Sequence, residues 1–359
     1  IDAAVQLALL NNRSLQATYE ELAIAQADLV QAGLLRNPVF SGKARFPDKG
    51  LSGTNTEFEL VQSFMDLLLR PLRKKLATAQ FEQAKLRVSD AVLDLAAEVK
   101  SAYYTLQGAG EIVALRRVFF AASEAAAELA GEQRRAENLS DLNLAGMQAA
   151  YHEANLELAG SEADEALARE ELGRLMGVSS GEHDWRVASR LPDFSRSEPP
   201  VESLEEVALS ERLDLAAAKK GVEILEAARS ASGIRSVLDV EVGASSEKSL
   251  DETHVTGPLW EIEVPIFDQG RAAGARSDAL LRQGKQRLAA LETEIRSEVR
   301  SAWTRLLAAR RASEYFHDTV IPLRERIVSL SQEQYNFMLL GPFSLLEAKQ
   351  EETNARSDY

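Results

Sequence analysis

Residues 98–103 read Glu-Val-Lys-Ser-Ala-Tyr, and residues 298–303 read Glu-Val-Arg-Ser-Ala-Trp. Around each copy, from Val88 to Ala109 and from Leu288 to Ala309, small or apolar residues recur at steps of three and four. That spacing is the seam of a coiled coil with a period near 3.5 residues. The sequence therefore predicts two long helices of one design, one in each half of the chain.

The duplication extends to the rest of the chain, because Leu15 and Gly33 line up with Leu215 and Gly233. We predict a first structural repeat at 1–176, a linker at 177–200 that is rich in Ser, Pro and Gly, and a second repeat at 201–359. Each repeat is predicted to hold a helix, a β-hairpin, a long helix and a return helix. The expected hairpins are 38–64 and 237–266, and the expected long helices are 67–136 and 271–338. A helix of about 70 residues is roughly 105 Å long, and Pro322 predicts a kink or short break in the second one.

The composition favours long helices over a packed globular core, with 45% hydrophobic, 27% charged and only 6% aromatic residues among 359. The net charge of −15 argues against nucleic acid as a partner, since an acidic surface repels phosphates. The chain has no cysteine and no run of 18 or more apolar residues, so neither a disulfide framework nor a transmembrane helix is predicted. We recognise no signal-peptide pattern in the sequence given, but both ends fall inside amphipathic patterns, and we expect them to be trimmed.

Both predicted hairpins alternate in polarity, as strands with one apolar and one charged face do. In the first, a turn is expected at 47–55, and in the second at 245–257. The apolar face is predicted to meet lipid and includes Phe40, Phe58, Val240 and Trp260. The other face is predicted to line a wet lumen. Its charged residues are Lys43, Arg45, Glu57, Glu59, Asp239, Glu241, Glu261 and Glu263.

Four strands are too few to close a barrel, yet open edges leave backbone N–H and C=O groups unpaired. Closure therefore needs several copies of the chain. Three copies would supply twelve strands, an even number within the range of outer-membrane barrels. The alternative is a pair of ordinary half-buried hairpins that pack on helices, with their charges in solvent.

The ordered set of elements, all duplicated, resembles the TolC-like family of outer-membrane efflux proteins over essentially the whole chain. Four local motifs carry the resemblance: Asn138-Leu139-Ser140-Asp141-Leu142, Arg174-Leu175-Met176-Gly177, Arg212-Leu213-Asp214-Leu215 and Val264-Pro265-Ile266-Phe267-Asp268. The run Leu60-Val61-Gln62, followed by Asp66 to Arg73, is similar to the heavy-metal efflux branch.

The resemblance implies a mainly α fold with a small β part, built as a trimeric α-barrel joined to a twelve-stranded transmembrane β-barrel with four strands per chain. It also implies a homotrimer in the lipid bilayer of the Gram-negative outer membrane, with a large periplasmic part. The implied partners are a periplasmic adaptor (membrane fusion) protein and an inner-membrane pump of the RND type. The implied function is that of a passive exit duct for metal ions or small toxic compounds in a tripartite efflux system.

The periplasmic tip is expected at two turns, 137–141 and 339–343. Family members carry acidic residues just after such turns, which form rings that constrict the channel and select cations. The matching candidates for the gate are Glu347, Ser344, which replaces a second acid, and Asp141. An acid near a helix start is also stabilised by the helix dipole without any channel role. The expected adaptor contacts are Asn138, Leu139, Leu339, Leu340, Gly341 and Phe343.

We find no candidate catalytic residue, cofactor site or metal site, and do not expect an enzyme. The four histidines, His152, His183, His254 and His317, are scattered, and no pair has a metal-ligand spacing. Two other functions stay open at this point: a duct for type I protein secretion, and a soluble coiled-coil scaffold. The scaffold predicts a monomer or dimer without detergent, whereas the duct predicts a stable trimer that conducts ions.

Overall fold

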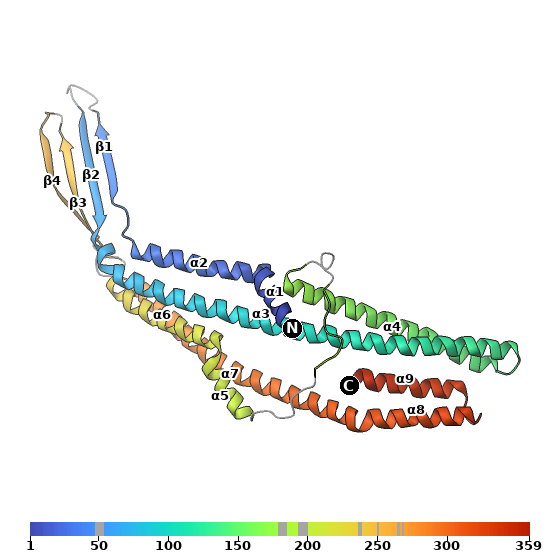
Figure 1. The fold of residues 1–359 in the computed structure, drawn as a ribbon. Helices are drawn as coiled ribbons and strands as arrows, with labels where there is room; N and C mark the ends of the chain where they lie inside the picture. The colour runs from blue at the N-terminus through green and yellow to red at the C-terminus, as the bar shows by residue number, and fades with distance from the viewer. Residues whose placement is uncertain are drawn as a thin grey trace. The chain divides into compact units, whose positions relative to one another are not determined.

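The computed structural model describes residues 1–46, 54–178, 185–192, 200–235, 239–249, 251–263, 266–267 and 269–359. The expected mainly α fold with one small sheet is confirmed (Figure 1). In the first half the elements are α1 (Asp2–Asn11), α2 (Arg13–Gly33), β1 (Val39–Arg45), β2 (Asn55–Ser63), α3 (Phe64–Arg135) and α4 (Asp141–Met176). In the second half they are α5 (Val201–Glu211), α6 (Leu213–Arg235), β3 (Asp239–Lys248), β4 (His254–Glu263), α7 (Arg271–Tyr315), η1 (Phe316–Val320), α8 (Ile321–Asn336) and α9 (Pro342–Asp358).

The helix that opens each half is broken once, which the sequence pattern did not predict. At Asn12 the side-chain oxygen accepts a hydrogen bond from the Leu15 N–H at 3.0 Å and so caps α2. The Asn12 amide group also donates to the Leu175 carbonyl oxygen at the end of α4, at 2.9 Å. In the second half, Asp214 accepts a hydrogen bond from the Leu215 N–H at 2.7 Å and pairs with Arg212 at the same distance. Two of the motifs that carry the family resemblance therefore lie at these helix breaks.

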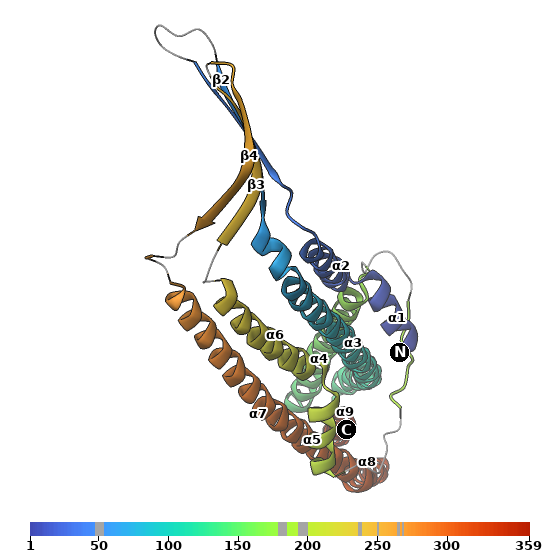
Figure 2. The ribbon, with the colours of Figure 1, turned by 90° about the vertical axis from the view of Figure 1, so that its left-hand side faces the viewer.

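The four strands form one antiparallel sheet in the order β1-β2-β3-β4 (Figures 1 and 2). The β2–β3 pairing joins the hairpin of one half to the hairpin of the other, from Thr56↔Lys248 to Ser63↔Glu241. A Cβ atom at Gly243 would lie 2.2 Å from the Leu60 carbonyl oxygen, so this pairing requires glycine there. Within the chain, β1 and β4 are the two edges of the sheet.

The prediction of a turn at 245–257 in the second hairpin is wrong at both boundaries, because the strands extend further on each side. β3 continues to Lys248 and β4 begins at His254, because Ser and Thr side chains do not interrupt a backbone ladder. Between the two strands, the Ser249 N–H bonds to the Thr253 carbonyl oxygen at 2.9 Å and Glu252 has φ +67°. Most of the expected first turn, at 47–53, lies outside the described residues.

The two long helices differ in continuity. α3 begins at Phe64, directly after β2 and three residues before the predicted start at residue 67. The second long helix is interrupted by the π-helical turn Phe316–Val320 before α8 starts, with Pro322 in its first turn. The break follows from Pro322, which has no N–H to donate to the carbonyl of Asp318 and whose ring clashes with that group.

The chain divides into two compact units that do not coincide with its sequence halves. One consists of Ile1–Gln16, Val92–Glu205 and Ser297–Tyr359, and the other of Ala17–Ala91 and Glu206–Arg296. The sheet lies in the second unit. In the first, a buried cluster of α3, α4 and α9 is formed by Phe119, Ala130, Met147, Ala154 and Leu346.

Among the described residues, no helix has the length and apolar composition that a membrane span requires.

The predicted linker is described only in part, at 177–178, 185–192 and residue 200. The described stretch is held against its own unit. Arg169 lies 4.2 Å from the centroid of the Trp185 ring and donates to the Trp185 carbonyl oxygen. The Gln107 amide donates to the carbonyl oxygens of Ala188 at 2.9 Å and Arg190 at 3.1 Å.

Candidate functional site

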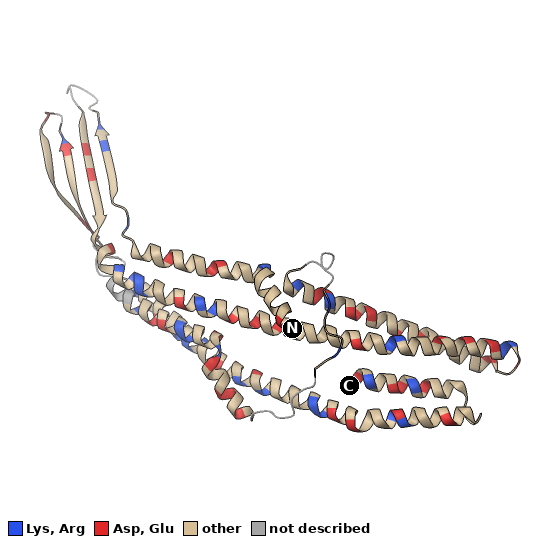
Figure 3. Ribbon diagram, in the orientation of Figure 1, with Lys and Arg blue, Asp and Glu red and all other residues tan. Residues whose placement is uncertain are grey.

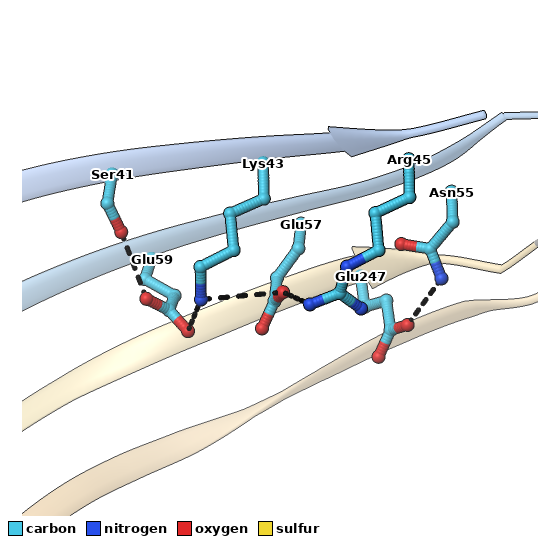
Figure 4. A network of polar contacts seen from close by, with 7 residues as sticks. All are labelled: Ser41, Lys43, Arg45, Asn55, Glu57, Glu59 and Glu247. Atoms are coloured by element: carbon cyan, nitrogen blue, oxygen red, sulfur yellow. Dashed lines mark hydrogen bonds and ion pairs between the residues drawn. The ribbon is translucent and has the colours of Figure 1, made fainter.

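One face of the sheet carries a network of charges between β1 and β2 (Figure 4). The Lys43 ammonium lies 3.5 Å from Glu59 and 3.7 Å from Glu57, and the Arg45 guanidinium lies 3.3 Å from Glu57. The Ser41 hydroxyl donates to Glu59 at 2.9 Å. Because pairs in register share a face, Lys43↔Glu57 and Ser41↔Glu59 belong to one surface.

The same surface becomes acidic towards β4. Glu57 is paired in register with Glu247, Glu241 with Glu261, and Asp239 with Glu263. Within the described part of the chain, the structure records no ion pair for Glu241, Glu261 or Glu263. The register thus places all eight candidate lumen residues on one face, with the cations on β1 alone.

The opposite face of the sheet carries exposed apolar side chains. The Phe40 and Phe58 rings stack with their centroids 5.9 Å apart. Trp260 and Ile262 follow the same alternation on β4, and both are exposed. Within the described ranges, Phe40, Phe58, Trp260 and Ile262 all remain exposed, so this face carries an uncovered apolar surface.

The two tip turns have the same backbone geometry. Each follows a helix that ends in a left-handed residue, Glu137 with φ 58° and Met338 with φ 59°. In both, the next residue donates its N–H to the carbonyl five residues back: Asn138 to Gln133 and Leu339 to Gln334, each at 2.9 Å. This is the bonding of a Schellman motif, which closes a helix end. Ser140 then caps α4, whereas Gly341 precedes Pro342 without a side-chain cap.

The three candidate gate residues do not come together within the chain. Ser344 and Glu347 line an open groove of about 490 Å³ between α8 and α9, together with Arg324, Gln334, Leu340 and Glu351. Asp141 lies at the other tip, where both of its carboxylate oxygens accept hydrogen bonds from Arg134, at 2.6 and 3.2 Å. The charge of Asp141 is therefore balanced locally, while no ion pair is recorded for Glu347 among the described residues.

The candidate adaptor residues differ in exposure. Leu339 is 77% exposed, and Asn138 and Gly341 are also exposed. Leu139 packs against the buried cluster of α3, α4 and α9, and Leu340 lines the groove. The Phe343 ring lies 3.4 Å from the position of a Cβ atom on Gly146 and so joins the two tips. Sequence reasoning missed the exposure of Met338, at 94%, of Phe337 beside it, and of Leu142 at the start of α4.

A buried carboxylate in α9 was also missed. Glu352 is only 4% exposed and accepts hydrogen bonds from Lys349 at 2.5 Å and Arg356 at 2.9 Å. Two residues further on, Asn354 shares the Arg116 guanidinium of α3 with Glu157 of α4, at 2.8 and 2.7 Å. These contacts fasten α9 to the α3–α4 pair. No local sequence pattern distinguishes Glu352 from its exposed neighbour Glu351.

The buried Glu352 carboxylate predicts a loss of stability in acid. Burial alone would raise its pKa, but the hydrogen bonds and charges of Lys349 and Arg356 outweigh burial and lower the pKa below 4.5. Its stabilising contribution is therefore complete above pH 4.5 and is lost as the pH falls through the lowered folded-state pKa. We expect Glu352→Gln to lower the thermal unfolding temperature at pH 7, but much less at pH 3. Glu351→Gln is the control, because Glu351 forms an exposed pair with Arg324, and equal losses in both variants at pH 7 would contradict this role.

The described residues contain no group of three or more His, Asp or Glu side chains that could hold a metal ion. His317 lies 2.7 Å from Asp318 in the π-helical turn, and His152 packs against Tyr151.

Comparisons with known proteins give a clear result only for the fold. No protein-family model matches the chain, and no curated protein matches it significantly. Among solved structures, the outer-membrane channel CmeC of Campylobacter jejuni is 15% identical with a TM-score of 0.80, covering 99% of this chain and 80% of that one. The open state of the outer-membrane channel MtrE of Neisseria gonorrhoeae is 19% identical with a TM-score of 0.74, covering 99% and 83%. The outer-membrane protein VceC of Vibrio cholerae is 15% identical with a TM-score of 0.71, covering 99% and 90%.

These structures match nearly the full length of the chain. The chain has the fold of the TolC-like outer-membrane efflux channels.

Proposed function

We propose that this chain forms the outer-membrane exit duct of a tripartite efflux system. The observation that carries the proposal is the four-stranded sheet, which is apolar and uncovered on one face and charged on the other. Such a sheet suits a wall between lipid and water. A soluble coiled-coil scaffold would leave Phe40, Phe58 and Trp260 in water with no compensating contact.

The sheet cannot close on itself, because β1 and β4 are its free edges. In a bilayer, each unpaired backbone N–H or C=O group at a strand edge costs roughly several kcal/mol. Both edges therefore need to pair with strands of other copies. In the proposed assembly, β1 of each chain pairs with β4 of the next, and three chains make a twelve-stranded barrel. The two sequence repeats, 1–176 and 201–359, each contribute one hairpin to it.

The helices extend the duct into the periplasm, and the tip turns meet the adaptor protein. The exposed Met338 and Leu339 offer an apolar contact, and Asn138 offers a polar one. In the proposed system an inner-membrane pump supplies the energy, and the duct itself is passive. The RND type of pump and a metal-ion or small-compound cargo remain the hypothesis that the sequence resemblance favours.

The proposal is tested by the full chain purified from outer membranes in detergent. We expect a trimer by mass measurement and discrete ion conductance in planar bilayers. A monomer that stays soluble without detergent and does not conduct would reject the duct in favour of the scaffold.

Charge reversal at Glu347 is expected to change ion selectivity. Three copies of this unpaired carboxylate would ring the tip, so Glu347→Lys should reduce the cation preference by about 3-fold or more. Reversal potentials in a salt gradient measure the effect. Glu333→Lys is the matched control, because Glu333 is exposed on α8 but does not line the groove. Equal selectivity in the wild type and Glu347→Lys would remove Glu347 from the gate.

A further inference from the structure

The first turns of α3 change from apolar to basic along the helix axis. Directly after β2, three apolar side chains are about half exposed: Phe64 (48%), Leu67 (52%) and Leu68 (58%). Over the next two turns the exposed basic residues are Arg70, Lys74 and Lys75. Figure 3 shows this basic run as blue segments near the start of α3. We call the exposed residues Phe64, Leu67, Leu68, Arg70, Lys74 and Lys75 the α3 collar.

On the buried side of the same turns, an ion cluster pairs Asp66 with two neighbouring arginines. Asp66 is buried and lies 3.1 Å from Arg73 and 3.3 Å from Arg36. The Arg73 guanidinium also donates to the Asp66 carbonyl oxygen at 2.9 Å, and Arg70 Nε donates to the Gly33 carbonyl oxygen at 2.6 Å. These contacts tie α3 to the end of α2, and they make the orientation of the collar rigid.

Lys74 and Lys75 take no part in that cluster. Both side chains are exposed, and the structure records no ion pair for either among the residues it describes. Between Phe64 and Thr78 the chain has four cations and one acid, a local net charge of +3 in a protein of net charge −15. Cations that are close together repel one another, so an anionic partner at this part of α3 would be favourable.

The axial order of the collar matches a membrane boundary. At 1.5 Å per residue, the seven steps from Leu67 to Lys74 cover about 10 Å, comparable to the depth over which a bilayer passes from acyl chains to headgroups. Lysine side chains near such a boundary extend to the headgroups while their methylene stems stay in apolar surroundings. The second hairpin ends in the same order: Phe267 is 99% exposed and is followed by the exposed Arg271 and Arg276.

We propose that the α3 collar binds the anionic headgroups of phospholipids in the periplasmic leaflet of the outer membrane. The inference rests on the proposed function, because it needs the sheet to lie in the bilayer. Leu67 and Leu68 contact acyl chains, and Lys74 and Lys75 contact the phosphate of a lipid such as phosphatidylglycerol. The collar sets the depth of the sheet in the membrane and selects anionic lipid at its base.

The experiment uses the full chain in nanodiscs of phosphatidylcholine with a minor share of phosphatidylglycerol. Native mass spectrometry measures the ratio of the two lipids retained per assembly. Each lysine near an anionic surface contributes about 5-fold in binding, so Lys74→Gln/Lys75→Gln should reduce the phosphatidylglycerol preference by about 30-fold. The control Arg87→Gln/Lys100→Gln removes two exposed cations further along α3 and should keep the preference.

Two further measurements make the outcome decisive. Free glycerol phosphate should not compete with the retained lipid, and competition by it would overturn a site that also requires acyl contact. Equal phosphatidylglycerol preference in the wild type and Lys74→Gln/Lys75→Gln would overturn the collar. Conductance recorded on the same preparations separates the two proposals: a conducting assembly without lipid preference overturns only the collar, and failure to insert overturns the duct as well.

Discussion

Cysteine pairs placed on β1 and β4 are expected to lock three copies of the chain into one covalent ring. The chain has no cysteine of its own, so every cross-link reports the engineered pair. Ser41 lies at the same level as Gly257 through the pairs Ser41↔Glu59, Glu59↔Ser245 and Ser245↔Gly257. A closed barrel staggers its register, so the true neighbour of Ser41 in the next chain is shifted by an even number of residues along β4.

The design is therefore a scan in which Ser41→Cys is combined in turn with Gly257→Cys, Leu259→Cys, Glu261→Cys or Glu263→Cys. All four positions share the face of Ser41, and a disulfide forms only where Cα atoms approach within about 7 Å. On oxidation, one or two pairs should give a band at three times the 39.4 kDa of a single chain. The reactive pair also measures the stagger of the barrel.

Controls come from the other face of β4. Pro258→Cys and Trp260→Cys place the thiol on the apolar side, where it cannot reach Ser41→Cys across a paired edge. A ladder of many sizes would mean an open chain of copies and not a ring. Monomer bands throughout the scan would reject the β1–β4 seam, and with it the proposed duct.

The strands could be predicted from the sequence because their signal is local. Alternation at period two depends only on which face each side chain takes, so the charged set from Lys43 to Glu263 was placed on one face before any pairing was known. The long helices were predictable for the same reason, since their apolar seam repeats over many turns. The local signal fails where polar residues belong to a strand. The composition around Ser245 and Ser246 indicated a turn, but both residues are paired in the β3–β4 ladder.

The helix breaks and the state of the tip depend on distant contacts and could not be predicted in the same way. Asn12 ends α1 because it also bonds to Leu175, 163 residues away. Asp141 was a candidate gate residue on its position alone, but its charge is balanced by Arg134, which faces it across the turn. Glu352 is buried only because α9 packs in its unit, so its importance has no signature in the local sequence.

Gly177 is expected to be the least replaceable glycine among the helix ends of this fold. It closes α4 with φ +68°, and its N–H and that of Val178 bond back to Arg174 and Gly173 at 3.2 and 3.0 Å. A Cβ atom there would lie 2.5 Å from the Asn11 carbonyl oxygen and 2.9 Å from the Asn12 nitrogen. These are backbone atoms, so they cannot turn aside as a flexible side chain would.

Gly177→Ala should therefore cost about 3–5 kcal/mol, from left-handed strain of roughly 1–2 kcal/mol and the displacement of the α1–α2 junction. The loss should appear as faster hydrogen exchange in α1 and at the end of α4, together with a lower unfolding temperature in detergent. Gly160→Ala is the matched control within α4, because nothing lies within 4 Å of its Cβ position. A helix-interior alanine at that site should stabilise the protein by about 0.5–1 kcal/mol. If the two variants shift stability in the same direction, the close approach of Gly177 to Asn11 and Asn12 does not hold the start of the chain in place.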